Sequence, residues 1–327
     1  IMARNSHTYD FDFKWFASHL GLLLLLIAMI AGMLHMCAPF LPAPRATWDM
    51  DRTIMATKAD LALKDEGADI VLIGDSSCLM NIDASQLGEL TGKKVVNLGT
   101  VSFLDMKIFS EILDRYLRTQ TKMPSEIVLM VHPDFLRRSS PSRSHVNWIH
   151  DYMAGKDHAT NGKSWTSAEY LFGVHVIKGR LLAWLPRPLS GAFGSYFGFT
   201  SNLETYMREH QGSAVDPRSI KASDLRGSKE YRVSAANLRN AEAFTNVMPE
   251  DVQLTVALSP TPASFADADL TTKFASILQE WKTALSADDI LDSLPLALED
   301  AQFANKTHLT PEAPQAYTLE LSSLLKR

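Results

Sequence analysis

The sequence predicts an α/β protein in which a parallel sheet lies between two helix layers, behind a single N-terminal transmembrane helix. Three observations predict this fold: a long uncharged apolar segment near the N-terminus, short apolar runs that end in glycine or polar residues, and helix-like segments between those runs. The chain has 327 residues, of which 46% are hydrophobic and 21% are charged. This composition is that of a globular protein and excludes a disordered chain or a coiled-coil rod.

Charge and cysteine content exclude further classes of protein. The net charge is −5 and no basic stripe occurs, so we expect no nucleic-acid partner. Cys37 and Cys78 are the two cysteines of the chain, too few for a disulfide scaffold or a Cys-rich zinc site.

The first element is a transmembrane helix predicted over residues 15–41, after a tail of residues 1–14. Residues 20–38 contain no Asp, Glu, Lys or Arg, and roughly 20 such residues cross a hydrocarbon layer of about 30 Å. The alternative is a cleaved signal peptide, because Lys14 precedes the apolar run. We expect an uncleaved anchor, since the run is long for a signal peptide and no clean small-x-small cleavage site follows it. The Lys and Arg residues on its two sides do not orient it.

A polar linker is predicted next, at residues 42–66, and the sheet-forming body at residues 67–327. Continuous apolar runs of this length are typical of buried parallel strands. Helical spacing of apolar residues, or a proline at the start, predicts helices between and after the strands. The predicted strands cover residues 68–74, 94–99, 126–131 and 252–258, and the predicted helices cover residues 104–119, 270–285 and 311–325.

An inserted region at residues 137–248 interrupts this alternation. It contains an aromatic, glycine-containing tract at residues 170–199. Residues 170–185 are too short and too polar to span a bilayer. They could lie on the membrane surface or against a partner, or the region could be a subdomain that packs on the sheet.

Three residues that could do chemistry follow predicted strands or precede the last helix. Ser76 follows the first strand and Gly99 follows the second, while His308 comes just before the final helix. Parallel sheets place their sites at the carboxyl ends of the strands, so we expect these residues to converge. A serine hydroxyl becomes a nucleophile when an adjacent imidazole takes its proton. Asp75 is expected to cap a helix, and Cys78 to be a small buried apolar residue.

Other kinds of site have weaker support. No phosphate-binding glycine motif follows a strand, so we expect no nucleotide cofactor. The metal-capable residues of the inserted region have no recognisable ligand spacing, and we expect neither a metal nor another cofactor. These metal-capable residues are His145, His150, Asp151 and His158.

Three short segments, which contain Ser76, Gly99 and His308, resemble motifs of the SGNH (GDSL-type) hydrolase superfamily. The fold of that superfamily is a three-layer α/β/α, flavodoxin-like parallel sheet. Residues 73–77 (IGDSS) look like its nucleophile block, residues 97–99 (NLG) like its glycine block, and residues 305–308 (NKTH) like its Asp-x-x-His block. The resemblance covers residues 68–134 and 252 to the C-terminus. It implies that Ser76 is the nucleophile, that His308 is the general base, and that the N–H groups of Ser76 and Gly99 form the oxyanion hole.

The chain departs from the family pattern at two places. Asn305 stands where the family has its acid; an amide can orient the imidazole but stabilises imidazolium less well than a carboxylate. The third block, usually Gly-x-Asn-Asp, is replaced by residues 131–134 (VHPD), where His132 could serve as the third oxyanion donor.

One apolar span followed by such a body is also similar to the anchored partners of membrane-bound O-acyltransferases. That likeness implies a single-pass protein of the cytoplasmic membrane with an extracytoplasmic (periplasmic) body. It would work beside an integral-membrane partner and transfer an acyl group to, or remove one from, a glycan or envelope polymer. A second hypothesis is a catalytically degenerate SGNH-like subunit that serves as an anchored accessory component of a membrane complex. Asn305, the altered third block and the aromatic tract motivate it.

Overall fold

The computed structural model describes residues 12–41, 49–138, 140–156, 166–178, 188–189, 197–215, 225, 231–265 and 268–325. The chain forms two compact units, which are described separately. The first contains residues 1–45 and 157–185, and the second contains residues 46–156 and 186–327.

The first unit is built around one long apolar helix, α1 (Phe13–Cys37), followed by the short 3-10 helix η1 (Ala38–Phe40). The side chain of Asp12 caps α1 by accepting hydrogen bonds from the backbone N–H groups of Lys14 and Trp15. Residues 13–40 are long and apolar enough to cross a membrane, a test that a signal sequence also passes. The described part of this unit also contains two short helices, α8 (Ser167–Leu171) and α9 (Val174–Val176).

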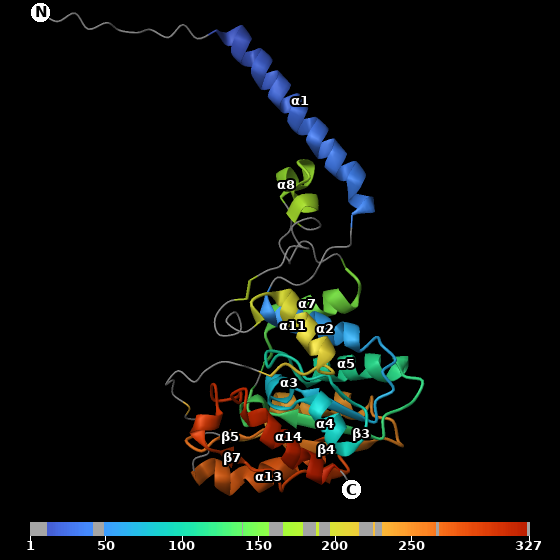
Figure 1. The fold of residues 1–327 in the computed structure, drawn as a ribbon, viewed down its shortest axis with the longest axis vertical. Helices are drawn as coiled ribbons and strands as arrows, with labels where there is room; N and C mark the ends of the chain where they lie inside the picture. Colours follow the sequence, from blue (N-terminus) through green and yellow to red (C-terminus); the bar gives the residue numbers. More distant parts are fainter. Residues whose placement is uncertain are drawn as a thin grey trace, which may run out of the picture. The chain divides into compact units, whose positions relative to one another are not determined.

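The second unit contains a five-stranded sheet in the order β2-β1-β3-β4-β6, with every neighbouring pair parallel. Figure 1 labels two of these strands, β3 and β4. All four predicted strands are confirmed. The fifth, β6, has two residues and is too short for a pattern to predict. The strands are β1 (Ile70–Gly74), β2 (Val95–Asn97), β3 (Glu126–Val131), β4 (Gln253–Leu258) and β6 (Asp289–Ile290); β5 (Thr261–Pro262) and β7 (Ala297–Leu298) form a separate parallel pair.

Helices follow most strands of this unit, and the three predicted helices are confirmed with shifts of up to two residues at their ends. The first part of the unit contains α2 (Met50–Leu61), α3 (Ser76–Asn81), α4 (Ala84–Thr91), α5 (Met106–Thr119), α6 (Pro133–Leu136) and α7 (Arg143–Met153). The later part contains α11 (Thr200–Glu209), α12 (Ala235–Thr245), α13 (Ala268–Ala284), the 3-10 helix η5 (Asp300–Gln302) and α14 (Ala313–Leu324).

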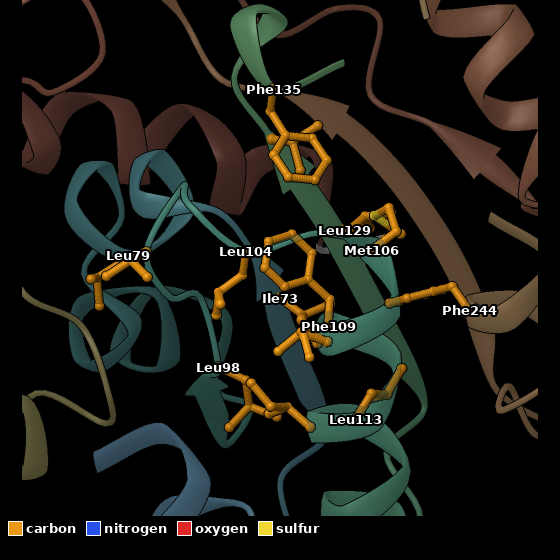
Figure 2. Close-up of a cluster of buried hydrophobic side chains, with 14 of the residues drawn as sticks. Ile73, Leu79, Leu98, Leu104, Met106, Phe109, Leu113, Leu129, Phe135 and Phe244 are labelled. Carbon is orange, nitrogen blue, oxygen red and sulfur yellow. The ribbon is translucent and has the colours of Figure 1, made fainter. Parts of the chain in front are cut away.

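Successive strand residues contribute to two separate hydrophobic clusters, as expected when both faces of a sheet are covered. In β1, Val71 and Ile73 belong to the larger cluster, whereas Ile70 and Leu72 belong to the smaller one. Figure 2 shows part of the larger cluster, where Ile73 and Leu129 of the sheet lie near Phe109 and other apolar residues of α5. The smaller cluster includes residues of α4 and α14.

The predicted linker at residues 42–66 contains a buried helix instead, α2. Ile54 and Met55 are fully buried in the larger cluster, and Lys58 is buried beside them. Charged residues, among them Asp51, Arg52, Lys58 and Asp60, give the segment its polar composition, although Lys58 is buried. In the inserted region, α12 packs on α5. Three aromatic residues of the tract at residues 170–199 lie outside the described residues: Trp184, Phe193 and Tyr196.

Candidate functional site

The first strand of the sheet ends in a tight turn that presents a serine. Gly74 is the last residue of β1, Asp75 caps α3, and Ser76 is the first residue of that helix. A Cβ atom at Gly74 would lie 1.7 Å from the carbonyl oxygen of Met130 in β3, so only glycine fits there. The Asp75 Oδ1 atom accepts hydrogen bonds from the N–H of Ser77 at 3.0 Å and from its hydroxyl at 2.6 Å. The expected capping role of Asp75 is therefore confirmed.

The structure brings the predicted imidazole to this serine. The His308 Nε2 atom lies 2.9 Å from Ser76 Oγ, although the two residues are 232 positions apart in the chain. Asn81, fully buried at the end of α3, fixes the histidine loop against this helix. Its Oδ1 atom accepts from the N–H of Leu309 at 2.9 Å, and its Nδ2 donates to the carbonyl of Thr307 at 3.0 Å.

Asn305 lies on the other side of the imidazole, and its amide orientation is fixed by its neighbours. Three donors converge on Asn305 Oδ1: the N–H of Thr307 at 3.0 Å, the hydroxyl of Thr307 at 2.9 Å and the N–H of His308 at 3.1 Å. The amide nitrogen Nδ2 therefore faces His308 Nδ1, at 3.2 Å. Because Nδ2 can only donate, His308 Nδ1 must accept, and the ring proton of a neutral His308 is on Nε2.

This tautomer matters for the serine. A general base needs an unprotonated Nε2 to accept the hydroxyl proton. With the proton on Nε2, the imidazole donates its hydrogen bond to Ser76 Oγ in the resting structure. The dyad therefore has the right distance for proton transfer but the wrong resting tautomer.

The predicted oxyanion donor Gly99 is in a different situation. Its N–H donates to the side-chain oxygen of Asn97 at 2.7 Å, so it is already engaged. A Cβ at Gly99 would lie 2.7 Å from the backbone nitrogen of Leu79, which shows that glycine is needed here for close packing on α3. The backbone N–H of Ser76 makes no hydrogen bond within the described part of the chain.

His132, at the end of β3, is buried with an unpartnered nitrogen. Its Nδ1 accepts from the N–H of Asp134 at 3.1 Å, which places the ring proton on Nε2. Burial lowers the pKa of His132 to about 4, because it outweighs the opposing effect of the nearby Asp134 and Asp75 carboxylates, so the ring is neutral at pH 7. The Nε2 atom has no hydrogen-bond partner among the described residues. His308 is among the groups whose charge affects this pKa.

An ion pair connects the His132 segment to the His308 loop. The Asp134 carboxylate lies 2.9 Å from Lys306 Nζ and 2.6 Å from Arg137 Nε. Burial would raise the pKa of Asp134, but the hydrogen bond from Arg137 and the neighbouring positive charges lower it overall. Lys306 belongs to the same short segment as Asn305 and His308, so Asp134 helps to hold that segment in place.

A buried lysine supports the strand end beside Gly99. The Lys58 side chain is fully buried, and its Nζ donates to the carbonyl of Asn97 at 2.8 Å and to the carbonyl of Gly212. Burial lowers the pKa of Lys58 to about 7. The Asn97 side chain in turn donates from Nδ2 to the carbonyl of Cys78 at 2.9 Å. Cys78 itself is buried, as expected, and burial raises the pKa of its thiol.

The metal-capable residues that the structure describes are His145, His150 and Asp151. Within the described ranges, no group of three or more His, Cys, Asp or Glu side chains is arranged to hold a metal ion. His145 Nε2 pairs with Asp51 at 3.3 Å, and His150 Nε2 pairs with Glu111 at 2.9 Å. His158 lies outside the described residues.

Sequence reasoning found Ser76, Asn305 and His308, which the structure brings together, and their catalytic roles stay predictions. It missed Asn81, whose signal was an amide directly after the apolar residues Cys78, Leu79 and Met80, and Lys58, for which the local sequence gives no signal. Comparison with known proteins adds no assignment: no protein-family model matches the chain, and no curated protein matches it either.

Proposed function

We propose that this chain is a membrane-anchored, SGNH-like acyltransferase or esterase that acts through Ser76 on an extracytoplasmic glycan or envelope polymer. The observation that carries the proposal is the 2.9 Å contact between Ser76 Oγ and His308 Nε2. This is the distance required of a nucleophile and its general base.

The sheet supports assignment to the SGNH-like, three-layer fold. With β6 counted as the fifth strand, the order is that of the flavodoxin-like doubly wound sheets, which bind ligands at the carboxyl ends of their strands. Ser76 lies just beyond the end of β1, at that edge. Hydrophobic clusters on both faces of the sheet support two helix layers.

The proposed reaction has two balanced steps. His308 first changes to its less favoured tautomer, with the ring proton on Nδ1, and loses the hydrogen bond from Asn305 Nδ2. Ser76 Oγ then attacks the carbonyl carbon of a donor ester and gives its proton to His308 Nε2, and the same nitrogen protonates the departing alkoxide as the donor C–O bond breaks. An acceptor hydroxyl, or water, next attacks the acyl carbon and passes its proton to His308, which returns one to Ser76 Oγ. The Ser76 N–H and His132 Nε2–H are the groups available to stabilise the oxyanion, because the Gly99 N–H is engaged.

A cavity in the same unit offers a candidate acceptor site, although neither Ser76 nor His308 lines it. It has a volume of about 330 Å³ and is lined in part by Asp83, Tyr206 and Pro311. Asp83 comes two residues after the end of α3, and Pro311 three residues after His308. A pocket with an aromatic ring, a carboxylate and amide side chains suits a sugar, whose hydroxyl groups need hydrogen-bond partners.

One observation favours a second candidate function. Asn305 Nδ2 faces His308 Nδ1, which keeps the proton on the nitrogen that should act as the base. This favours an anchored accessory subunit, associated with an integral-membrane partner, in which the dyad remains but does not turn over.

Labelling with a serine-directed fluorophosphonate separates the two candidates. The full-length protein in lipid nanodiscs is treated with the probe, and the modified residue is identified by peptide mass spectrometry. The Ser76→Ala variant should lose the adduct, while the matched Ser77→Ala variant, which removes the neighbouring hydroxyl bonded to Asp75, should retain it. Absence of an adduct in folded wild-type protein, with labelling restored in Asn305→Asp, would favour the accessory subunit.

A further inference from the structure

The short helices of the first unit pack on one face of α1. The ring of Tyr170 lies 5.4 Å from the ring of His35, between centroids. Gly173 adopts a positive φ of 68°, and a Cβ atom there would lie 3.0 Å from two side-chain atoms of Leu34. The backbone of the α8–α9 segment (residues 166–178) therefore approaches α1 so closely that only glycine fits without a shift.

Burial along α1 agrees with this packing. Most of its residues are exposed, but Ile27, Ala31, Leu34 and His35, together with Ala38 of η1, are partly or fully covered. Their spacing places them on one helical face. Ala31 is the sole residue of α1 that is classed as buried. The covered face lies mostly in the last turns of α1.

The α8–α9 segment exposes its own large apolar side chains. Leu171 is 65% exposed, Tyr170 59%, Phe172 46% and Ile177 36%, whereas the smaller Gly173 and Val176 are buried. Such a concentration of exposed apolar side chains in 13 residues is unusual for a surface in contact with water.

Two charged side chains of the segment, Glu169 and Lys178, are paired with each other. Thr166 and Glu169 form a capping box at the start of α8, and Lys178 Nζ lies 3.7 Å from the Glu169 carboxylate. Exposed apolar side chains combined with charged groups are typical of segments that lie in a membrane interface.

We infer that the α8–α9 segment is a second membrane-embedded element, whose exposed apolar side chains contact lipid acyl chains beside the last turns of α1. The inference rests on the proposed role of α1 as a membrane anchor. The end of α1 on which the segment packs also exposes apolar side chains, which include Met33 at 59% and Met36 at 77%. A lipid environment that surrounds α1 would therefore also cover the segment packed on it.

The position along α1 sets the expected depth. Leu34 is three residues before the end of α1, which corresponds to about 4.5 Å along the helix axis. Tyr170 and His35 would then lie near the headgroup boundary, where aromatic side chains with a polar edge are favoured. We therefore expect shallow insertion of the segment, with Leu171 and Phe172 in the outer part of the hydrocarbon layer.

Depth-dependent fluorescence quenching tests the inference. Full-length protein carrying Cys37→Ser is given a single reporter cysteine by Leu171→Cys, labelled with an environment-sensitive dye, and placed in nanodiscs. Cys78 is buried and does not label in folded protein. The dye should be quenched more by lipids with a nitroxide near the headgroup than by lipids with a mid-chain nitroxide, and should be protected from aqueous iodide.

Two control positions keep the outcome unambiguous. Leu25→Cys, in the middle of α1, should be quenched most by the mid-chain nitroxide, and Ser276→Cys, exposed on α13 of the second unit, by iodide alone. Lipid quenching at position 25 with iodide quenching at position 171 would overturn the inference and indicate that a protein partner covers the segment instead. Iodide quenching at position 25 would overturn the anchor itself.

Discussion

Replacing Asn305 with aspartate should activate the dyad. Asn305 Oδ1 already accepts three hydrogen bonds, and a carboxylate of the same shape can retain them. The second carboxylate oxygen would then take the place of Nδ2, 3.2 Å from His308 Nδ1, and accept its proton. The ring would change to the tautomer with an unprotonated Nε2, which can accept the proton of Ser76 Oγ, and the carboxylate would also stabilise the imidazolium that forms.

The size of the effect follows from this change of tautomer. In Ser-His-Asp triads, the reverse change from carboxylate to amide lowers turnover about 10⁴-fold because it imposes the wrong tautomer. We expect Asn305→Asp to raise the rate by a similar factor, about 10⁴, which corresponds to about 5.5 kcal/mol of transition-state stabilisation. The engaged N–H of Gly99 affects wild type and variant alike, so it cancels in their ratio.

The assay is hydrolysis of p-nitrophenyl acetate by full-length protein in nanodiscs, together with the rate of fluorophosphonate labelling. Asn305→Ala, which removes both the acceptor and the donor, should not gain activity. Asn305→Asp combined with Ser76→Ala measures the background rate. If Asn305→Asp changed both rates by less than tenfold while the protein remained folded, the argument from the tautomer would be refuted.

Three further predictions concern the supports of the site. Gly74→Ala should lower the free energy of unfolding by more than about 4 kcal/mol, because the new Cβ atom would overlap the carbonyl oxygen of Met130. The control Gly67→Ala places its Cβ in open space and should cost only about 1–2 kcal/mol, from the positive φ of that residue. Equal effects of the two substitutions in chemical unfolding would contradict this account. Because the pKa of Lys58 is lowered in the folded protein, the unfolded chain binds more protons than the folded chain between about pH 7 and pH 10. The free energy of unfolding should therefore rise with pH in this range, by up to about 1.4 kcal/mol per pH unit. This rise should be absent from the Lys58→Met variant. Lys306→Met should lower the rate at which the fluorophosphonate labels Ser76, because the ion pair between Lys306 and Asp134 positions the His308 loop. The unfolding midpoint should remain nearly unchanged, since this ion pair is partly exposed. A midpoint that falls in parallel with the labelling rate would indicate a purely structural role.

The sheet and the dyad could be predicted because their signals are local. Buried parallel strands produce continuous apolar runs, and a serine that follows such a strand lies at the carboxyl edge of the sheet. His308 follows no predicted strand, and its approach to Ser76 was expected from the resemblance of residues 305–308 to the Asp-x-x-His block. The helix α2 was missed because its charged residues give it the polar composition of a linker, although one of them, Lys58, is buried. Its partners are the backbone carbonyls of Asn97 and Gly212, and no residue pattern announces a backbone acceptor.

The tautomer of His308 also could not be predicted from the sequence. The replacement of an acid by Asn305 was visible, but its consequence depends on which end of the amide faces the ring. The backbone turn at Thr307 and His308 decides this by directing its donors at Oδ1. Likewise, the contact between Gly173 and Leu34 joins segments that are far apart in the chain. Composition alone did not decide whether the aromatic tract lies on the membrane surface, against a partner or on the sheet.

The most direct test of the central claim is to trap the acyl group. Full-length protein is incubated with an activated acetyl ester, quenched in acid and digested, and the acetylated residue is identified by tandem mass spectrometry. Our account predicts an ester on Ser76 that forms slowly in wild type, accumulates faster in Asn305→Asp and is absent from His308→Ala. Acetylation at another residue, or equal acetylation of Ser76 with and without His308, would contradict the proposed dyad.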